Sequence, residues 1–257
     1  MTDNKKLFFG LKRSKVDPAE RKLSMPQCNT IYLPSSFSFK EKVKQVYDQS
    51  CLNACSANAA ANFLSLSDKV DYNISRLFLY FCTRFIDNNH MLPVEDHGAT
   101  LRNVFTSLNQ YHCHYIEEVK YPYEIEKVNS IPPREIFEED ITVNKCPTIS
   151  YRQIMPTKYN LRYILSNLKK PILFGIMVYS NFFKLTAKDN DILNIPSASD
   201  EILGGHAVVL VGYDDTTQTF DVLNSHGSQF ADGGYFRLKY DYALNPDLAF
   251  EFYIVDG

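Results

Sequence analysis

The chain has 257 residues, of which 45% are hydrophobic and 22% are charged, and its formal net charge is −3. This composition is ordinary for a globular protein, and the charge balance argues against a nucleic-acid binder or a polybasic membrane protein. No run of about 18 apolar residues is present, so we expect no transmembrane helix. The N-terminus is too broken by charges to be a secretory signal peptide.

The first 30 residues are polar and charged and lack a sustained hydrophobic period, so we expect an extension with little structure of its own. Ile31 to Leu33 is a candidate for a short strand ended by Pro34. The six cysteines show neither zinc-site spacing nor a regular framework, and without an export signal free thiols are the default. A bridge that involves Cys28 or Cys51 stays open.

The stretch from Asp48 to Leu64 leads through Cys55 into an alanine-rich run, which predicts a helix at about 54–66 with Asn53 as a good N-cap type. A thiol in the first turn lies at the positive end of the helix dipole beside unpaired amides, and both favour the thiolate. By itself this stretch fits a nucleophile and a buried core thiol equally well.

Apolar residues at the helical period predict two further helices, from Ile74 to about Asn88 and from about Thr100 to Tyr111. In the second half a short helix is expected at 160–168. Alternating or β-branched runs predict strands in ITVN, TISYRQI, KKPILFGIMVYS, HAVVLVGYDD, TFDVLNSHG, GGYFRLKY and AFEFYIVDG. Helices first and strands later indicate an α+β protein with two subdomains that face each other.

A thiolate nucleophile needs an imidazole that accepts and returns its proton, and a group that orients the imidazole. His206 begins a buried-looking strand behind two glycines, and Asn224 closes the strand that follows. Taken singly, these residues are more often a core histidine and a turn former. His112 and His114 are a poor metal signal, because neighbours on an extended chain point to opposite faces.

Together, Gln49, Cys55 six residues later, GHAVVLVGY, and NSHG followed by GGYFRLKY resemble the papain-like (cathepsin-like) cysteine peptidase family. Cys55 precedes His206 by 151 residues and Asn224 by 169, which is close to the family's spacing. HGATLRNVFTSLNQYH followed by KYPYE resembles the family's glycine-walled subsite, next helix and YPYE segment, so the resemblance covers about residues 33–257. The short N-terminal region is similar to the compact branch of bacteria and large DNA viruses, which lacks the long inhibitory prodomain.

The resemblance implies a papain-like two-subdomain α+β fold in a peptidase domain at 31–257. A helical left subdomain (about 45–122) and an antiparallel β-barrel right subdomain (about 123–257) would hold the active-site cleft between them. The N-terminal extension, residues 1–30, would either cover this cleft or pack on the barrel as a tail.

The resemblance also implies the roles of single residues. Cys55 would be the nucleophile, His206 its general base and later acid, and Asn224 the residue that orients the imidazole. The Gln49 side chain, with the Cys55 backbone amide, would form the oxyanion hole. Gly98 would line the cleft, and Gly204 and Ala207 would help to line the pocket for the side chain two residues before the scissile bond.

The chain departs from the family pattern at several positions. Leu52 and Ser56 stand where the family has a disulfide cysteine and an aromatic residue, so that disulfide is expected to be absent. Asn53 replaces a glycine near the oxyanion hole. His226 replaces the tryptophan of NSWG, and we expect it to shield the bond between Asn224 and His206 less well from water and so to reduce activity or change its pH dependence. Phe230 is a candidate for part of the missing aromatic cover.

The implied function is that of a thiol endopeptidase acting on proteins or peptides, with no metal or organic cofactor and with neither nucleic acid nor membrane as partner. Without a signal peptide the protein would act inside a cell, or be packaged in a virion if it is viral. The first alternative keeps the fold without the activity, as a weak or inactive homologue that acts as a binding or structural protein. The second is another acyl transfer, such as transamidation.

Overall fold

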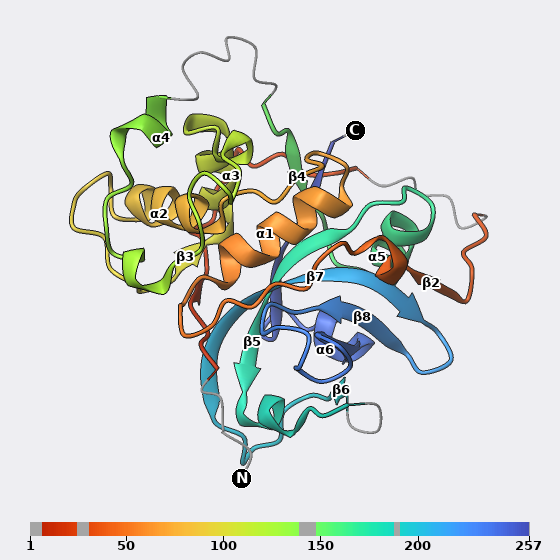
Figure 1. Cartoon of the computed structure of the whole chain (residues 1–257). Coiled ribbons are helices and arrows are strands. Elements are labelled where there is room, and N and C mark those ends of the chain that lie inside the picture. The colour runs from red at the N-terminus through yellow and green to blue at the C-terminus, as the bar shows by residue number, and fades with distance from the viewer. Residues whose placement is uncertain (1–6, 25–30, 139–147, 188–190, 257) are drawn as a thin grey trace.

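The structure is a computed structural model that describes residues 7–24, 31–138, 148–187 and 191–256. The expected strand ITVN, Cys28 and Cys146 lie outside these residues. The first half of the chain contains the helices α1 (Cys55–Leu66), α2 (Arg76–Asp87) and α3 (Leu101–Gln110). Helix α1 contacts α2 and α3 as well as the strands β5 and β7, so it lies between the other two helices and the sheet (Figure 1).

The starts of α2 and α3 have side-chain caps. The Ser75 hydroxyl accepts a hydrogen bond from the Phe78 amide, and the Thr100 hydroxyl accepts one from the Asn103 amide. Helix α1 differs, because its N-cap is Ala54 and no side chain caps it. The prediction that Asn53 caps α1 is therefore wrong.

The second half of the chain forms most of a ten-stranded sheet with the order β4-β10-β5-β7-β8-β9-β6. Its central pairs are antiparallel, and β7 is its longest strand. Among the described residues the end strands β4 and β6 do not pair with each other, so the expected closed barrel is wrong in this detail and the sheet is open. The bounds are β4 Tyr151–Gln153, β5 Ile172–Tyr179, β6 Ile192–Leu193, β7 Ile202–Asp214, β8 Thr219–Leu223, β9 Tyr235–Lys239 and β10 Ala249–Val255.

The shorter elements connect and cover these layers. Helix α5 (Lys158–Ser166) packs on β5 and β7, and the short α6 (Tyr240–Leu244) follows β9. The others are β2 Ser36–Ser38, β3 Ala99–Thr100, α4 Arg134–Glu138 and the 3-10 turns η1 Lys40–Lys42, η2 Cys113–Tyr115, η3 Ile125–Lys127 and η4 Ser180–Lys184. Each described helix is too short or too polar to cross a lipid bilayer.

The expected strand at Ile31 to Leu33 is wrong, because the chain pairs with β7 only from Ser36 onward. Side chains hold the preceding segment instead. The Pro34 carbonyl accepts hydrogen bonds from the Tyr213 hydroxyl at 2.8 Å and from Arg162 at 3.2 Å. The apolar residues alone predicted strand pairing here. The hydrogen bonds that hold this segment instead come from side chains of β7 and α5.

The N-terminal extension does have structure of its own. Its strand β1 (Leu11–Lys12) pairs in parallel with β3 and antiparallel with Gly205 of β7. The segment thus lies along the border between the helical part and the sheet, where Figure 1 draws it in red. Further on, Lys22 forms a parallel bridge with Gln153 of β4. Short apolar stretches inside a charged sequence gave no period from which this pairing was predictable.

Candidate active site

Cys55 is the first residue of α1 and is fully buried. Its thiol lies beside the backbone amides of Ala207 in β7 and Gly10 in the N-terminal segment. Burial raises the pKa of the Cys55 thiol, and these amides and that of Ser56 oppose the rise in part. The alanines of α1 are buried, and their small side chains let the helix contact β7 closely.

A chain of hydrogen bonds joins His206, Asn224 and His226. The His206 Nε2 atom lies 2.7 Å from Asn224 Oδ1, and Asn224 Nδ2 lies 2.9 Å from His226 Nδ1. Because a carboxamide oxygen accepts and its nitrogen donates, His206 carries a proton on Nε2 and His226 accepts through Nδ1. In the described part of the chain His206 Nδ1 has no hydrogen-bond partner, which leaves it available for the thiol.

Aromatic rings enclose these two imidazoles. Phe9 meets both His206 and His226 edge-on, with ring centroids 5.4 Å and 5.7 Å away. Phe182 lies at 6.2 Å and 6.3 Å, and Phe230 stacks on Phe182. The hydrogen bond between His206 and Asn224 is therefore buried, and the expectation of a water-exposed bond is wrong in this state of the protein.

Burial lowers the pKa of His206 to about 4, although the hydrogen bond to Asn224 opposes this change. The same burial raises the pKa of the Cys55 thiol. Both effects favour the neutral forms of the pair. Burial thus disfavours charge on both the thiol and the imidazole.

Gln49 directs its carboxamide into the same space. Its Nε2 atom donates to the Phe8 carbonyl at 3.1 Å and to the Leu52 carbonyl at 2.8 Å, and its Oε1 atom accepts from the Ser225 hydroxyl at 2.7 Å. The Ser225 bond fixes which side of the carboxamide donates. One N–H of Gln49 therefore holds its own loop, and the other holds the N-terminal segment.

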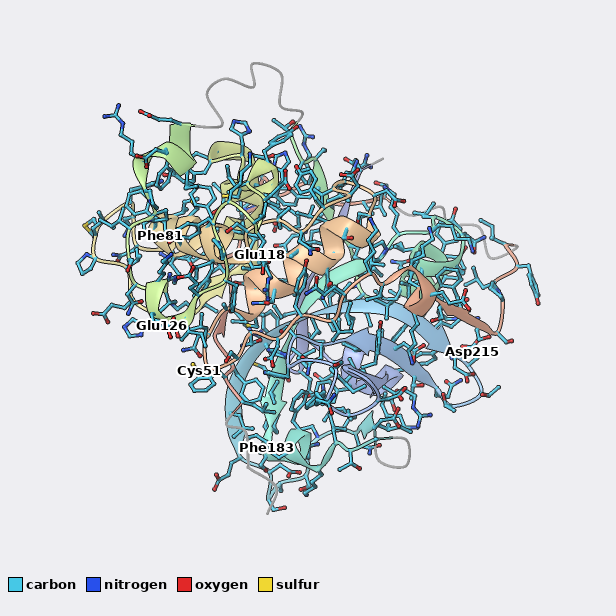
Figure 2. The ribbon with its side chains drawn as sticks, in the orientation of Figure 1. Cys51, Phe81, Glu118, Glu126, Phe183 and Asp215 are labelled. Atoms are coloured by element: carbon cyan, nitrogen blue, oxygen red, sulfur yellow. The ribbon has the colours of Figure 1, made fainter. Side chains whose placement is uncertain are left out.

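A buried arginine supports the loop that carries Gln49. Arg76 of α2 forms a paired contact with Glu118 at 2.7 Å and 2.8 Å, and its guanidinium lies 4.2 Å from the ring centroid of Tyr47 and 4.1 Å from that of Tyr123. The Tyr123 hydroxyl in turn donates to the Gln49 carbonyl at 3.1 Å. Figure 2 labels Glu118 within the helical part of the molecule.

A second network of hydrogen bonds joins the loop before Cys55 to Gly98. Asn53 donates from its backbone amide to the Asp96 carboxylate at 3.1 Å and from its side chain to the Asp96 carbonyl at 2.8 Å. The Tyr80 hydroxyl donates to the same carboxylate at 2.6 Å and accepts from the Gly98 amide at 3.1 Å. Asn53 is therefore occupied as an anchor of this loop, which explains why it does not cap α1.

Gly98 and Gly204 lie along the N-terminal segment, and Ala207 follows in β7 beside the Cys55 thiol. A Cβ atom on Gly98 would lie 1.6 Å from the Gly10 carbonyl oxygen, and one on Gly204 would lie 3.0 Å from that of Phe9. Both glycines also have positive φ, at +75° and +144°. The backbone of the segment thus passes directly over these glycines, which explains why no larger residue fits there while it is in place.

The structure brings the candidate site residues into one region: Gln49, Cys55, Gly98, Gly204, His206, Ala207 and Asn224. Several residues that the sequence did not indicate lie with them: Phe8, Phe9, Gly10, Tyr80, Asp96 and Phe182. Their signal was weak, because each is an ordinary residue type in an ordinary segment. Cys51 and Cys55 carry free thiols, and Cys51 is exposed at the border of the helical part and the sheet (Figure 2).

This arrangement and the sequence both match known proteins. The model of the papain family cysteine proteases matches residues 33–250, so the chain belongs to that family. An uncharacterized peptidase C1-like protein of Acanthamoeba polyphaga mimivirus is 32% identical over 222 residues, which are 81% of this chain and 68% of the relative.

Solved structures agree with the fold. Xylellain, a cysteine protease from Xylella fastidiosa, is similar with a TM-score of 0.81 and 25% identity over 96% of this chain and 95% of its own. Procathepsin L 3 from the larval midgut of Tenebrio molitor has a TM-score of 0.61 and 19% identity over 93% and 75% of the two chains. The papain-like α+β fold is thereby established, and relatives from a virus and a bacterium agree with the compact branch of the family.

Proposed function

We propose that the protein is a thiol endopeptidase that hydrolyses peptide bonds through an acyl-enzyme at Cys55. The observation that carries this proposal is the 2.7 Å bond from His206 Nε2 to Asn224, which leaves His206 Nδ1 as the ring nitrogen that can exchange a proton with the thiol. The position of Cys55 at an uncapped helix start supports the same role.

The chemistry would follow from these positions. His206 Nδ1 takes the proton of Cys55 as Sγ attacks the substrate carbonyl carbon, and it returns that proton to the leaving amine. The Gln49 Nε2–H that now holds Phe8, together with the Cys55 backbone amide, would donate to the oxyanion. A water molecule, deprotonated by the same imidazole, then releases the acyl group and regenerates the thiol.

The groove now filled by the N-terminal segment would hold the substrate. Gly98 would face the substrate backbone, while Gly204 and Ala207 would line the pocket for the residue two before the scissile bond. The contacts of Gly98 and Gly204 with residues 9 and 10 support this assignment, because an extended chain is already held there.

We also propose that residues 1–30 are a covering segment that keeps a peptidase domain at 31–257 latent. Phe8 occupies the Gln49 donor, and the Gly10 amide faces the Cys55 thiol. An amide N–H is not an electrophile, so the segment fills the groove at the sulfur without offering a carbonyl carbon there. By excluding water it also keeps the thiol and imidazole neutral.

The test uses an opened variant of the full chain, Gly10→Val. A side chain at position 10 meets the Asn53 backbone and Cβ at 2.4 Å, so valine cannot be accommodated while the segment lies in the groove. We expect the opened variant to cleave fluorogenic peptides and to form one adduct with a peptidyl epoxide at Cys55, detected by mass spectrometry. Cys55→Ala in the same background is the control.

A lack of both cleavage and adduct in the opened variant, with the fold intact by circular dichroism, would overturn the peptidase proposal. It would favour the second candidate, an inactive homologue that acts as a binding protein. The filled groove is the observation that supports this alternative, since an extended chain is already held there.

A further inference from the structure

His226 occupies the place of the family's tryptophan, and its ring lies flat against that of His206. The ring centroids are 4.9 Å apart and the planes differ by 9°. Both rings are buried, with exposed fractions of 3% and 0%. A tryptophan at this place would be a neutral cover, whereas an imidazole brings a second group that can take up a proton.

The two imidazoles share one carboxamide between them. Asn224 accepts from His206 through Oδ1 and donates to His226 through Nδ2. This arrangement requires a lone pair on His226 Nδ1, so it exists only while that nitrogen is unprotonated. The orientation of Asn224, and through it the tautomer of His206, is thus linked to the proton state of His226.

Protonation of His226 at Nδ1 would reverse the donor and acceptor roles in the hydrogen bonds that join His206, Asn224 and His226. The Asn224 carboxamide would have to turn over so that its oxygen accepts a hydrogen bond from His226. Its Nδ2 atom would then face His206 Nε2 as a donor. His206 would carry its proton on Nδ1, the atom that has to receive the proton of Cys55. It would also be unable to become an imidazolium without placing two cations in a stack at 4.9 Å.

The described groups that face His226 come from several elements. His206 faces it from β7, and Phe9, Phe182 and Phe230 surround it without charge. Asp48, in the loop before α1, bridges to His226 through the backbone, and its carboxylate lies against Gly227. An imidazolium at His206 would oppose a second positive charge on His226, whose ring is stacked on it. The site therefore has reason to hold one positive charge, at either ring but not at both.

We propose that His226 is a positioning residue that acts through Asn224 as a proton-controlled gate on His206, so that the catalytic base works only while His226 is neutral. This rests on the proposed peptidase function. It predicts that the acidic limb of the activity profile reports protonation of His226, and that removal of this titrating group extends activity to lower pH.

Two variants separate the gate from a simple cover, both in the opened Gly10→Val background. His226→Gln supplies a carbonyl oxygen that still accepts from Asn224 but does not titrate. His226→Phe supplies a ring of similar size with neither property. We expect the ratio of kcat/KM at pH 5.5 to that at pH 7.5 to be at least about tenfold higher in His226→Gln than in the opened parent. The His226→Phe variant should lose activity at every pH. Its pH profile of kcat/KM should also lack the acidic fall that protonation of residue 226 causes.

The matched control is His114→Gln, a second buried histidine in the helical part of the molecule, which should leave the shape of the profile unchanged. If His226→Gln has the same acidic limb as its parent, the gate is wrong. If both His226 variants lower activity by one common factor at all pH values, the residue is only a cover.

A second measurement does not need enzymatic activity. In the full chain with Cys55→Ala, imidazole nitrogen NMR follows His206 and His226 through a pH titration. We expect the two imidazoles together to take up one proton over a wide range of pH. In His226→Gln the midpoint of the His206 titration should move to higher pH. Independent titrations of the two rings would overturn the gate, whereas inactivity of the opened variant alone would refute only the peptidase proposal.

Discussion

The side-chain amide of Gln49 donates a 3.1 Å hydrogen bond to the carbonyl oxygen of Phe8, 41 residues earlier in the chain. Through this bond the N-terminal segment occupies the donor that a peptidase would reserve for its oxyanion. The same segment places the Gly10 amide on the Cys55 thiol. One docked segment therefore contacts both Gln49 and Cys55.

Opening the cleft should make Cys55 reactive. In the Gly10→Val variant we expect alkylation of Cys55 by iodoacetamide at pH 7 to become at least about tenfold faster than in the wild type, because water returns to the thiol and lowers its pKa. The control is Val16→Asp, at a position in the same segment that is 93% exposed. Peptide mapping follows the alkylation of Cys55. Equal alkylation rates in the wild type, Gly10→Val and Val16→Asp would contradict the covering role of the segment.

Loss of the Asn224 side chain should affect both catalysis and folding. In the opened background, Asn224→Ala removes the acceptor of His206 Nε2 and is expected to lower kcat/KM by roughly 10²-fold. The free energy of unfolding should fall as well, by about 1–3 kcal/mol for each of the two buried ring nitrogens left unpaired, His206 Nε2 and His226 Nδ1. Peptide hydrolysis and urea denaturation measure the two effects, and an unchanged kcat/KM would speak against a role for Asn224 in orienting the base.

The buried pair of Arg76 and Glu118 should contribute strongly to stability. Arg76→Met removes a guanidinium that holds Glu118 and Asn58 and lies between two tyrosine rings. We expect a loss of about 3–5 kcal/mol, because a partly buried carboxylate is left without its partner. The comparison is Arg134→Met, which breaks the exposed pair with Glu138 and should cost below about 1 kcal/mol. Similar losses in urea denaturation would show that burial does not decide the difference.

Acid should destabilise the folded protein through its buried histidines. Burial lowers the pKa of both His206 and His114 to about 4, from an ordinary value of 6.5. Between these pH values the unfolded chain holds more protons, so the free energy of unfolding falls as the pH drops from 6.5 to 4 and is unaffected by these groups at higher pH. The loss approaches roughly 2–3 kcal/mol for each histidine.

The measurement for this acid effect is denaturant unfolding at several pH values. His114→Gln removes one titrating group and should flatten the slope in that window while leaving the region above pH 7 unchanged. A slope as steep as that of the wild type would show that His114 does not titrate as its burial requires.

The sequence by itself determined the family and the fold class, because Gln49, Cys55, His206 and Asn224 keep a fixed order and spacing that a common fold imposes. It also located the four longest helices and the strands β4, β5, β7, β8, β9 and β10 to within a few residues, since their apolar patterns are strong. Period and spacing are local or pairwise properties, and a sequence displays both.

Only the tertiary structure decided how residues with no period meet. The strand β1 forms in a charged segment because β3 and β7 supply its hydrogen-bond partners from distant parts of the chain. Asn53 does not cap α1, because it is hydrogen-bonded to Asp96. His226 is buried against His206 by Phe9 and Phe182. Each outcome depends on contacts between residues far apart in sequence, and the types of those residues do not specify which partners they meet.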